Sequence, residues 1–134
     1  MSSQDSKPLS IEQGHCYLVD MNPPRKSKPG KIRPVVVVQS SDTLQAGSPG
    51  VVIVPLTSKI REGNVLRIRI RPAAGLRLQQ PSDCLLDQLH TIDRSLFLQE
   101  LGVVSTEDFQ RIEEGIRFLM GFCKWSDRAS GPDL

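Results

Sequence analysis

Two short runs of β-branched residues constrain the fold of this chain more than any other feature. Residues 35–38 read VVVV and residues 51–54 read VVIV. Each run is too short for a buried helix, and its side chains branch at Cβ, so both are predicted to be buried strands. Pro34 lies at the start of the first strand, and Pro55 is expected to end the second, where a missing N–H is tolerated.

Two polar side chains flank these strands. Arg33 stands just before the first run and Thr57 shortly after the second. A guanidinium and a hydroxyl that are held at the ends of rigid strands can both bind a phosphate oxygen. The pair is therefore a candidate phosphate site.

Other patterns predict more strands and one helix. Residues 16–19 and 84–86 are short apolar runs, and residues 65–71 alternate between apolar and basic side chains. Residues 40–50 and 72–81 are rich in turn-forming residues and are interpreted as connections.

A helix is expected over residues 106–122, because Ser105 and Asp108 form a capping pair and apolar residues then recur at helical spacing. Five or six short strands followed by this helix indicate a small, strongly curved β-barrel. We expect a single domain over residues 12–124, with flexible tails at residues 1–11 and 125–134.

Charge is unevenly distributed along the chain. Residues 1–80 contain 12 lysines and arginines against 5 acidic residues, whereas residues 81–134 contain 5 against 10. The basic half favours a polyanionic partner, although scattered solvated charge would give the same composition. No apolar run suits a signal peptide or a membrane span, so a cytoplasmic protein is expected.

Two basic segments are candidates for phosphate contacts. The proline-rich loop over residues 20–31 is either a mobile flap over a nucleic-acid backbone or a solubilising loop. Arg67, Arg69 and Arg71 share one face of an alternating strand. This face is either simply solvated or bound to RNA phosphates.

The cysteines and histidines do not form a metal-binding pattern. Cys16, Cys84 and Cys123 are odd in number, lack CxxC spacing and lie among apolar residues, which predicts buried thiols in a reducing compartment. His15 and His90 are far apart in the sequence. No metal and no cofactor are therefore expected.

Four segments, in order, resemble the MazF/PemK/Kid toxins of bacterial toxin–antitoxin systems. They are GHCYLVDMNP at residues 14–23, RPVVVVQ at 33–39, VPLTS at 54–58 and LDQLHTIDRS at 86–95. The resemblance covers about residues 13–122. It implies an SH3-like barrel with a C-terminal helix, a homodimer, and a metal-independent endoribonuclease that cuts single-stranded mRNA at short sequences. It also implies a MazE-like antitoxin that lies across the RNA groove.

The resemblance assigns the catalytic arginine to Arg33 and the catalytic threonine to Thr57. Several other residues are candidate RNA contacts. They are Arg25, Lys26, Ser27, Lys28, Lys31, Ser58, Lys59, Arg67, Arg69, Gln88 and His90.

A metal-independent ribonuclease can use the ribose 2′-OH as nucleophile, which yields a 2′,3′-cyclic phosphate and a 5′-OH. Arg33 suits the stabilisation of the phosphorane, and Thr57 can hydrogen-bond the phosphate or the 2′-OH. Asp87, His90 and Asp93 are the candidates for proton transfer, and each also has a possible structural role. Two alternatives stay open: a non-catalytic, CcdB-like toxin that binds gyrase, and a plain nucleic-acid-binding barrel.

Overall fold

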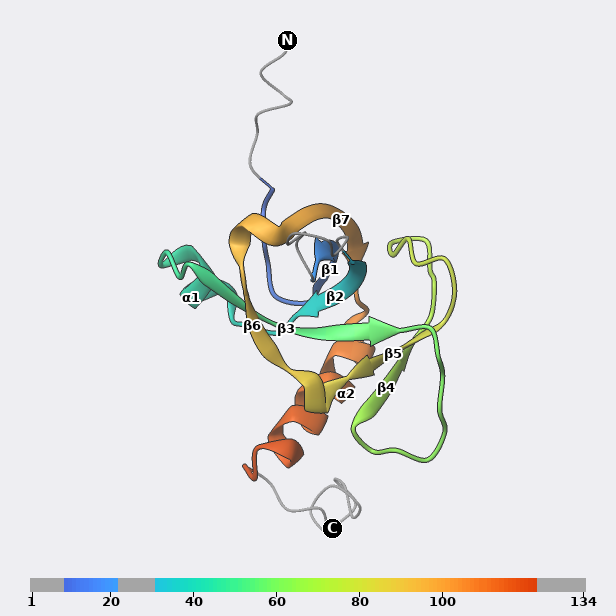
Figure 1. Ribbon diagram of the computed structural model, residues 1–134. Helices are drawn as coiled ribbons and strands as arrows, with labels where there is room; N and C mark the ends of the chain where they lie inside the picture. The colour runs from blue at the N-terminus through green and yellow to red at the C-terminus, as the bar shows by residue number, and fades with distance from the viewer. Residues whose placement is uncertain (1–8, 22–30, 123–134) are drawn as a thin grey trace.

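The computed structural model describes residues 9–21 and 31–122, and seven antiparallel strands in these residues form one curved sheet (Figure 1). The strands are β1 (His15–Asp20), β2 (Ile32–Val37), β3 (Gly50–Thr57), β4 (Arg67–Ile70), β5 (Ser82–Leu85), β6 (His90–Asp93) and β7 (Phe97–Val103). Their order is β4-β5-β3-β2-β1-β7, and β6 also pairs with β3. The helices are α1 (Ser41–Gln45) and α2 (Thr106–Leu119), and the 3-10 turns are η2 (Leu86–Gln88) and η3 (Arg94–Leu96).

The central strand β3 runs through Pro55 instead of ending there, so the prediction of a strand end at this proline is wrong. Residues Gly50 to Ile53 pair with β6, whereas Leu56 and Thr57 pair with β5. Pro55 falls in the interval between these two ladders, where its missing N–H does not interrupt either of them. The strand therefore reaches Thr57 with its direction unchanged.

The two valine runs are apolar throughout because both faces of the sheet are covered. Val36 and Val54 belong to a core cluster that includes Ile112 of α2, whereas Val35 and Val37 belong to a second cluster around Tyr17. Neighbouring side chains of a strand point to opposite faces, so a strand that is buried on both sides loses the polar alternation.

The connection between β4 and β5 bridges to β7 and gives the sheet its barrel-like form. The Arg77 N–H donates to the Leu101 carbonyl at 2.8 Å, and the Val103 N–H donates to the Gly75 carbonyl at 2.9 Å. Among the described strands no continuous ladder joins β4 to β7, so the barrel is completed by this connection. The predicted mainly β, barrel-like fold with a C-terminal helix is confirmed.

Helix α2 lies across the sheet and begins where the capping pair predicts (Figure 1). The Ser105 hydroxyl accepts a hydrogen bond from the Asp108 N–H at 3.0 Å. The helix ends at Leu119, three residues earlier than expected, because Gly121 adopts φ +81° and the Phe122 N–H bonds back to the Arg117 carbonyl. A left-handed glycine with such a bond is a common helix stop.

Strand β7 and helix α1 were not predicted. The ladder between β1 and β7 contains two register shifts, between Cys16 and Tyr17 and between Leu18 and Val19. These irregularities break the alternation by which a half-buried strand is recognised in a sequence. Helix α1 has only five residues, capped by Ser40, and is too short for a periodic pattern.

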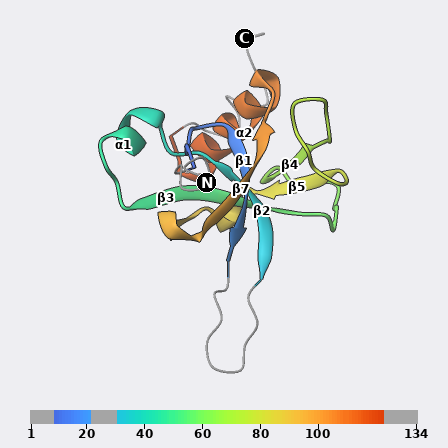
Figure 2. The same cartoon turned by 90° about the horizontal axis from the view of Figure 1, so that it is seen from above.

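The proposed tails at residues 1–11 and 125–134 fall largely outside the described residues. In the part of the chain that the structure describes, no helix is long and apolar enough to cross a membrane. The ends of β1 and β2 at Asp20 and Ile32 extend to the side of the molecule opposite α2 (Figure 2).

The bridge between the β4–β5 connection and β7 depends on a glycine. Gly102 has φ +136°, and a Cβ there would lie 2.1 Å from the Gly75 carbonyl oxygen. We expect Gly102→Ala to lower the free energy of unfolding by at least about 2 kcal/mol, because backbone strain and a backbone clash add. Gly63→Ala is the matched control: Gly63 has φ +80° but open space around it, so the cost should be about 1 kcal/mol. Urea denaturation measures the free energy of unfolding of both variants. Equal losses in Gly102→Ala and Gly63→Ala would show that the clash with the Gly75 carbonyl does not contribute.

Candidate functional site

A cleft of about 400 Å³ lies at the ends of β2 and β3, with the β4–β5 connection as its other wall. Four sequence-predicted residues line it: Arg33, Thr57, Ser58 and Lys59. The structure therefore brings together the guanidinium and the hydroxyl that the sequence placed at two separate strand ends.

The register of the sheet explains why Arg33 and Thr57 lie close together. Val35 of β2 lies opposite Pro55 of β3, and the same register, continued by two residues, places Arg33 opposite Thr57. Residues opposite each other in an antiparallel pair project to the same face. Two residues that are 24 positions apart in the chain thus become neighbours.

Arg33 is half-buried, and its guanidinium has no carboxylate partner among the described residues. In particular, no ion pair joins it to Asp87 or Asp20 there. Other arginines are engaged, since Arg94 binds carbonyls of the α1–β3 region and Arg111 pairs with Asp108. A cation that lines a cleft and has no described counter-charge can bind an anionic ligand, which makes Arg33 the strongest anion-binding candidate.

The hydroxyl oxygen of Thr57 takes part in one hydrogen bond within the fold. Its Oγ1 accepts a hydrogen bond from the Lys59 N–H at 3.2 Å, in a short turn after β3. Because the oxygen is already an acceptor, the hydroxyl hydrogen is left to be donated to a group in the cleft. An anionic oxygen would satisfy this donor.

Sequence reasoning missed the other wall of the cleft. Arg77, Gln79, Gln80 and Ser82 line it, but residues 72–81 were interpreted only as a connection. Arg77 is oriented by a hydrogen bond from Nη2 to the Glu100 carbonyl at 2.6 Å. The available signal in the sequence was Arg77 together with the amides of Gln79 and Gln80. Only tertiary contacts, however, place this connection against Arg33 and Thr57.

Arg67 and Arg69, which were candidate RNA contacts, bind a buried carboxylate instead of lining the cleft. Asp83 of β5 is 1% exposed, and its Oδ1 accepts from Arg69 Nε at 2.7 Å and its Oδ2 from Arg67 Nη1 at 3.0 Å. The Arg61 N–H also donates to Oδ2 at 3.0 Å. Both guanidinium groups are therefore used within the fold, and an RNA role for them stays untested.

Asp83 is ionised despite its burial. Burial raises the pKa of this carboxyl, but the hydrogen bonds from Arg69, the Arg61 N–H and Arg67 outweigh that effect and hold the pKa below its usual range. The buried negative charge is thus balanced locally by two cations. Its stabilising contribution should depend on pH.

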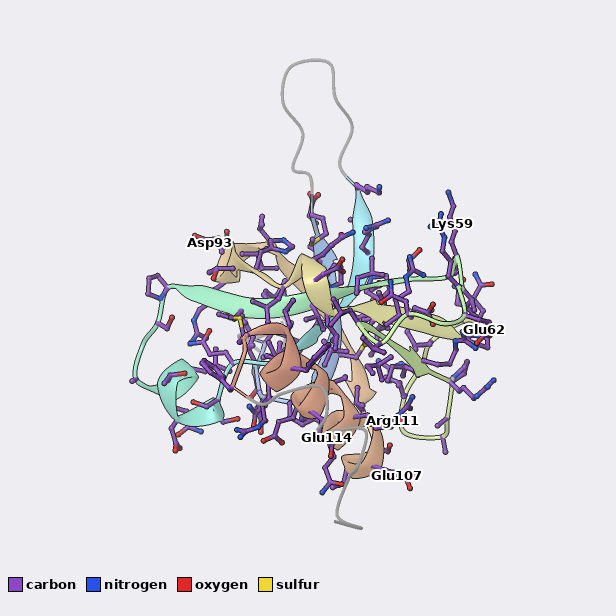
Figure 3. All side chains as sticks on the ribbon, turned by 90° about the horizontal axis from the view of Figure 1, so that it is seen from below. Lys59, Glu62, Asp93, Glu107, Arg111 and Glu114 are labelled. Atoms are coloured by element: carbon purple, nitrogen blue, oxygen red, sulfur yellow. The ribbon has the colours of Figure 1, made fainter. Side chains whose placement is uncertain are left out.

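The candidates for proton transfer lie outside the cleft. Asp93 caps η3 by accepting from the Ser95 N–H at 2.8 Å, and this hydrogen bond lowers the pKa of its carboxyl. Figure 3 shows Asp93 on the opposite side of the molecule from Lys59. His90 is exposed, with its Nδ1 2.7 Å from the Gln88 carbonyl. Asp87 and Gln88 are exposed in η2, and neither lines the cleft.

The remaining predicted RNA contacts lie on the β1–β2 connection. Lys31 is exposed at the start of β2, and its N–H donates to Asp20 Oδ1 at 3.3 Å. The others lie outside the described residues. They are Arg25, Lys26, Ser27 and Lys28.

Two of the three cysteines are buried core residues, as predicted, and Cys123 lies outside the described residues. Burial raises the pKa of Cys16 to about 12 and raises the pKa of Cys84 well above its usual value. Both thiols therefore stay protonated near neutral pH and are poor nucleophiles. Within residues 9–21 and 31–122, no three His, Cys, Asp or Glu side chains are grouped as metal ligands.

Comparison with known proteins agrees with this arrangement. The model of the PemK-like, MazF-like toxins of type II toxin–antitoxin systems matches residues 12–120. The chain is 29% identical over 112 residues to "Endoribonuclease MazF" of Staphylococcus saprophyticus, which covers 83% of this chain and 92% of the relative.

Solved structures show the same fold. The Mycobacterium tuberculosis toxin MazF-mt6 aligns with TM-score 0.66 and 19% identity, over 83% of this chain and 99% of that one. A mycobacterial endoribonuclease in complex with its cognate antitoxin aligns with TM-score 0.68 and 17% identity, over 86% and 99%. The chain belongs to the family of PemK-like, MazF-like toxins of type II toxin–antitoxin systems.

The Asp83 cluster predicts a pH-dependent effect on stability. Asp83→Asn should lower the free energy of unfolding at pH 7 by about 3 kcal/mol, because two arginines lose their buried counter-charge. The folded-state pKa of Asp83 is depressed, so its contribution is fully present above the unfolded pKa of about 4 and is lost as pH falls through the lower folded value. The difference between wild type and variant should therefore shrink below about pH 4.

Denaturant unfolding at several pH values measures this difference. Asp108→Asn is the matched control, because Asp108 pairs with the half-exposed Arg111 on α2 and should contribute less than about 1 kcal/mol. If the unfolding free energy of Asp83→Asn stays below that of wild type by the same amount down to pH 3, the loss of the Asp83 charge is not the cause.

Proposed function

We propose that this chain is an endoribonuclease toxin that cleaves single-stranded RNA by attack of the ribose 2′-OH, with Arg33 and Thr57 as catalytic residues. One observation carries the proposal: an arginine that has no ion-pair partner among the described residues and a threonine hydroxyl line the same cleft from adjacent strands. The relative from Staphylococcus saprophyticus, which is named an endoribonuclease, supports the class of reaction.

In the proposed reaction the 2′-oxygen forms a bond to phosphorus while the bond from phosphorus to the 5′-oxygen breaks. The 2′-OH proton is lost and the 5′-oxygen gains one, so the products are a 2′,3′-cyclic phosphate and a 5′-OH. Arg33 donates to the non-bridging oxygens, whose negative charge grows in the phosphorane. Because Arg33 belongs to the paired strand β2 and lines the cleft, this donor is at the site before the substrate arrives.

Thr57 is assigned the role of a donor. Its oxygen accepts from the Lys59 N–H, so its hydrogen is available to donate to the phosphate and help to orient it for in-line attack. The ionisable side chains among the described residues that line the cleft are Arg33, Lys59 and Arg77. Three cations raise the local affinity for a polyanion, and they also favour the extra charge of the transition state.

The same cleft suggests how RNA is held. Lys59 and Arg77 lie on opposite walls and can contact phosphates, whereas Gln79 and Gln80 carry amides that can pair with base edges. The sequence-predicted contacts at Lys31 and Ser58 extend this path toward β2. We therefore assign positioning to the cations and base recognition to the two glutamines.

We further propose a homodimer that is inhibited by a cognate antitoxin in the cytoplasm. The mycobacterial relative was solved with its cognate antitoxin, which supports a protein inhibitor here. Exposed apolar side chains on the end of α2, including Met120 and the 70% exposed Phe122, support contact with a second copy.

Cleavage should need the substrate's own hydroxyl and no added metal. Purified protein with a long single-stranded RNA in EDTA should give fragments that end in a cyclic phosphate. A single 2′-deoxy substitution at the cut nucleotide should abolish cutting and leave binding largely intact, because the nucleophile is removed. Cleavage of the deoxy substrate would show that water attacks. Intact RNA together with inhibited gyrase would favour the CcdB-like alternative, and RNA binding alone would favour a plain binding barrel.

Arg33 should matter far more for catalysis than for stability. Arg33→Ala should change the free energy of unfolding by only about 0.5 kcal/mol, because no described carboxylate depends on this side chain. Single-turnover cleavage should fall by about a hundred- to a thousandfold, since a preorganised donor to the phosphorane is lost. Arg33→Lys should also be strongly impaired, because it keeps the charge and loses the planar fork.

Melting temperature and dimer mass establish that each variant is folded. A folded, dimeric Arg33→Ala protein that cuts RNA at nearly the wild-type rate would remove Arg33 from the active site. A lowered melting temperature with a proportional loss of activity would instead indicate a structural role.

A further inference from the structure

The buried carboxylate of Asp83 is connected to the catalytic hydroxyl through one arginine. Arg67 Nη1 carries two hydrogens, and it donates to Asp83 Oδ2 and to the Lys59 carbonyl, each at 3.0 Å. Because Asp83 is fixed in β5 and almost fully buried, it holds this guanidinium in one place. Arg67 thereby connects the sheet to the turn that follows β3.

The turn after β3 is held on both sides of Lys59. The carbonyl of this residue accepts from Arg67, and its N–H donates to Thr57 Oγ1 at 3.2 Å. The turn has no regular secondary structure to fix it, so the place of the Lys59 peptide groups depends on these two hydrogen bonds and on the Arg61 N–H, which donates to Asp83 Oδ2 at 3.0 Å. The Lys59 N–H occupies one acceptor position of the Thr57 hydroxyl and so limits the directions in which its hydrogen can donate.

The register of the sheet places these groups in one row. Thr57 of β3 lies opposite Asp83 of β5, and Asp83 lies opposite Arg69 of β4. Arg69 fills the Oδ1 side of the carboxylate and also contacts Glu62 at 3.2 Å. Figure 3 shows Lys59 and Glu62 on the same side of the molecule, where the turn leaves β3.

We propose that Arg67, anchored on Asp83, is a positioning residue for the active site: it fixes the Lys59 peptide so that the Thr57 hydroxyl donates into the cleft. This inference rests on the proposed ribonuclease function. It gives Arg67 a different role from the RNA contact that its alternating strand suggested. A positioning residue affects the rate of the chemical step, whereas a phosphate contact affects RNA affinity.

The side chain of Arg67 is 16% exposed, and its bonds to Asp83 and to Lys59 leave little of it for RNA. A lysine at this position would keep the charge and could pair with Asp83. Its single ammonium lacks the planar fork that reaches both acceptors in fixed directions, so the bond to the Lys59 carbonyl would be weakened. Arg67→Lys therefore separates charge from positioning.

The test is single-turnover cleavage of RNA in EDTA by wild type, Arg67→Lys, Thr57→Val and the double variant. Arg67→Lys should slow the maximal rate by about ten- to a hundredfold, since small displacements of a catalytic group have effects of this size. The RNA concentration at half-maximal rate should not change. In the Thr57→Val background the same substitution should have no further effect, because the hydroxyl through which it acts is absent.

Arg111→Lys is the matched control, since Arg111 also donates from Nη1 to an aspartate but lies on α2, and it should cleave normally. Asp83→Asn, assayed well below its melting temperature, is a second variant and should also slow the maximal rate without changing affinity. Melting temperatures establish that every protein is folded during the assay.

Three results would overturn the inference while leaving the proposed function intact. They are a normal rate for Arg67→Lys, a loss of RNA affinity with an unchanged maximal rate, and an equal effect of Arg67→Lys with and without the Thr57 hydroxyl. Absence of cleavage by wild type would instead overturn the proposed function, and the inference with it.

Discussion

The pairing of β3 with three different strands is the constraint on which the rest of this structure depends. Its first four residues are paired with β6, its middle residues Ile53 to Pro55 with β2, and its last two residues with β5. A strand in this position is buried on both faces, so almost all its residues must be apolar. The change of partner falls at Pro55, and the strand therefore carries Thr57 from the core to the edge of the cleft with a fixed orientation.

The distribution of arginines follows from the cost of burying charge. Asp83 is buried and ionised, so it requires cations close by, and Arg67 and Arg69 supply them from the adjacent strand. Arg33 has no such partner in the described parts of the chain and faces a cleft. Arg67 and Arg69 are thus used within the fold, whereas Arg33 lines the cleft and is available to bind an anion.

A site residue could be predicted from the sequence only where it lies next to a local pattern, such as a run of strand-forming residues. Arg33 and Thr57 adjoin the two strongest strand signals, so their place at strand ends was readable from the sequence. The wall formed by Arg77, Gln79 and Gln80 could not be predicted from the sequence. It belongs to an irregular connection whose position depends on a bridge to β7. Likewise, the bulges of β7 hid that strand, and the buried partner of Arg67 and Arg69 lies in another strand.

The sequence by itself determined the class of fold, the start of α2 and the residues that match the toxin family, because these follow from local propensity and from short motifs. Only the tertiary structure decided which arginines pair with Asp83, which wall faces Arg33 and which N–H donates to the Thr57 hydroxyl. These properties depend on register between strands that are distant in the chain, and a register is set by packing of both faces at once. The function of each polar side chain was therefore determined by its neighbours across the sheet.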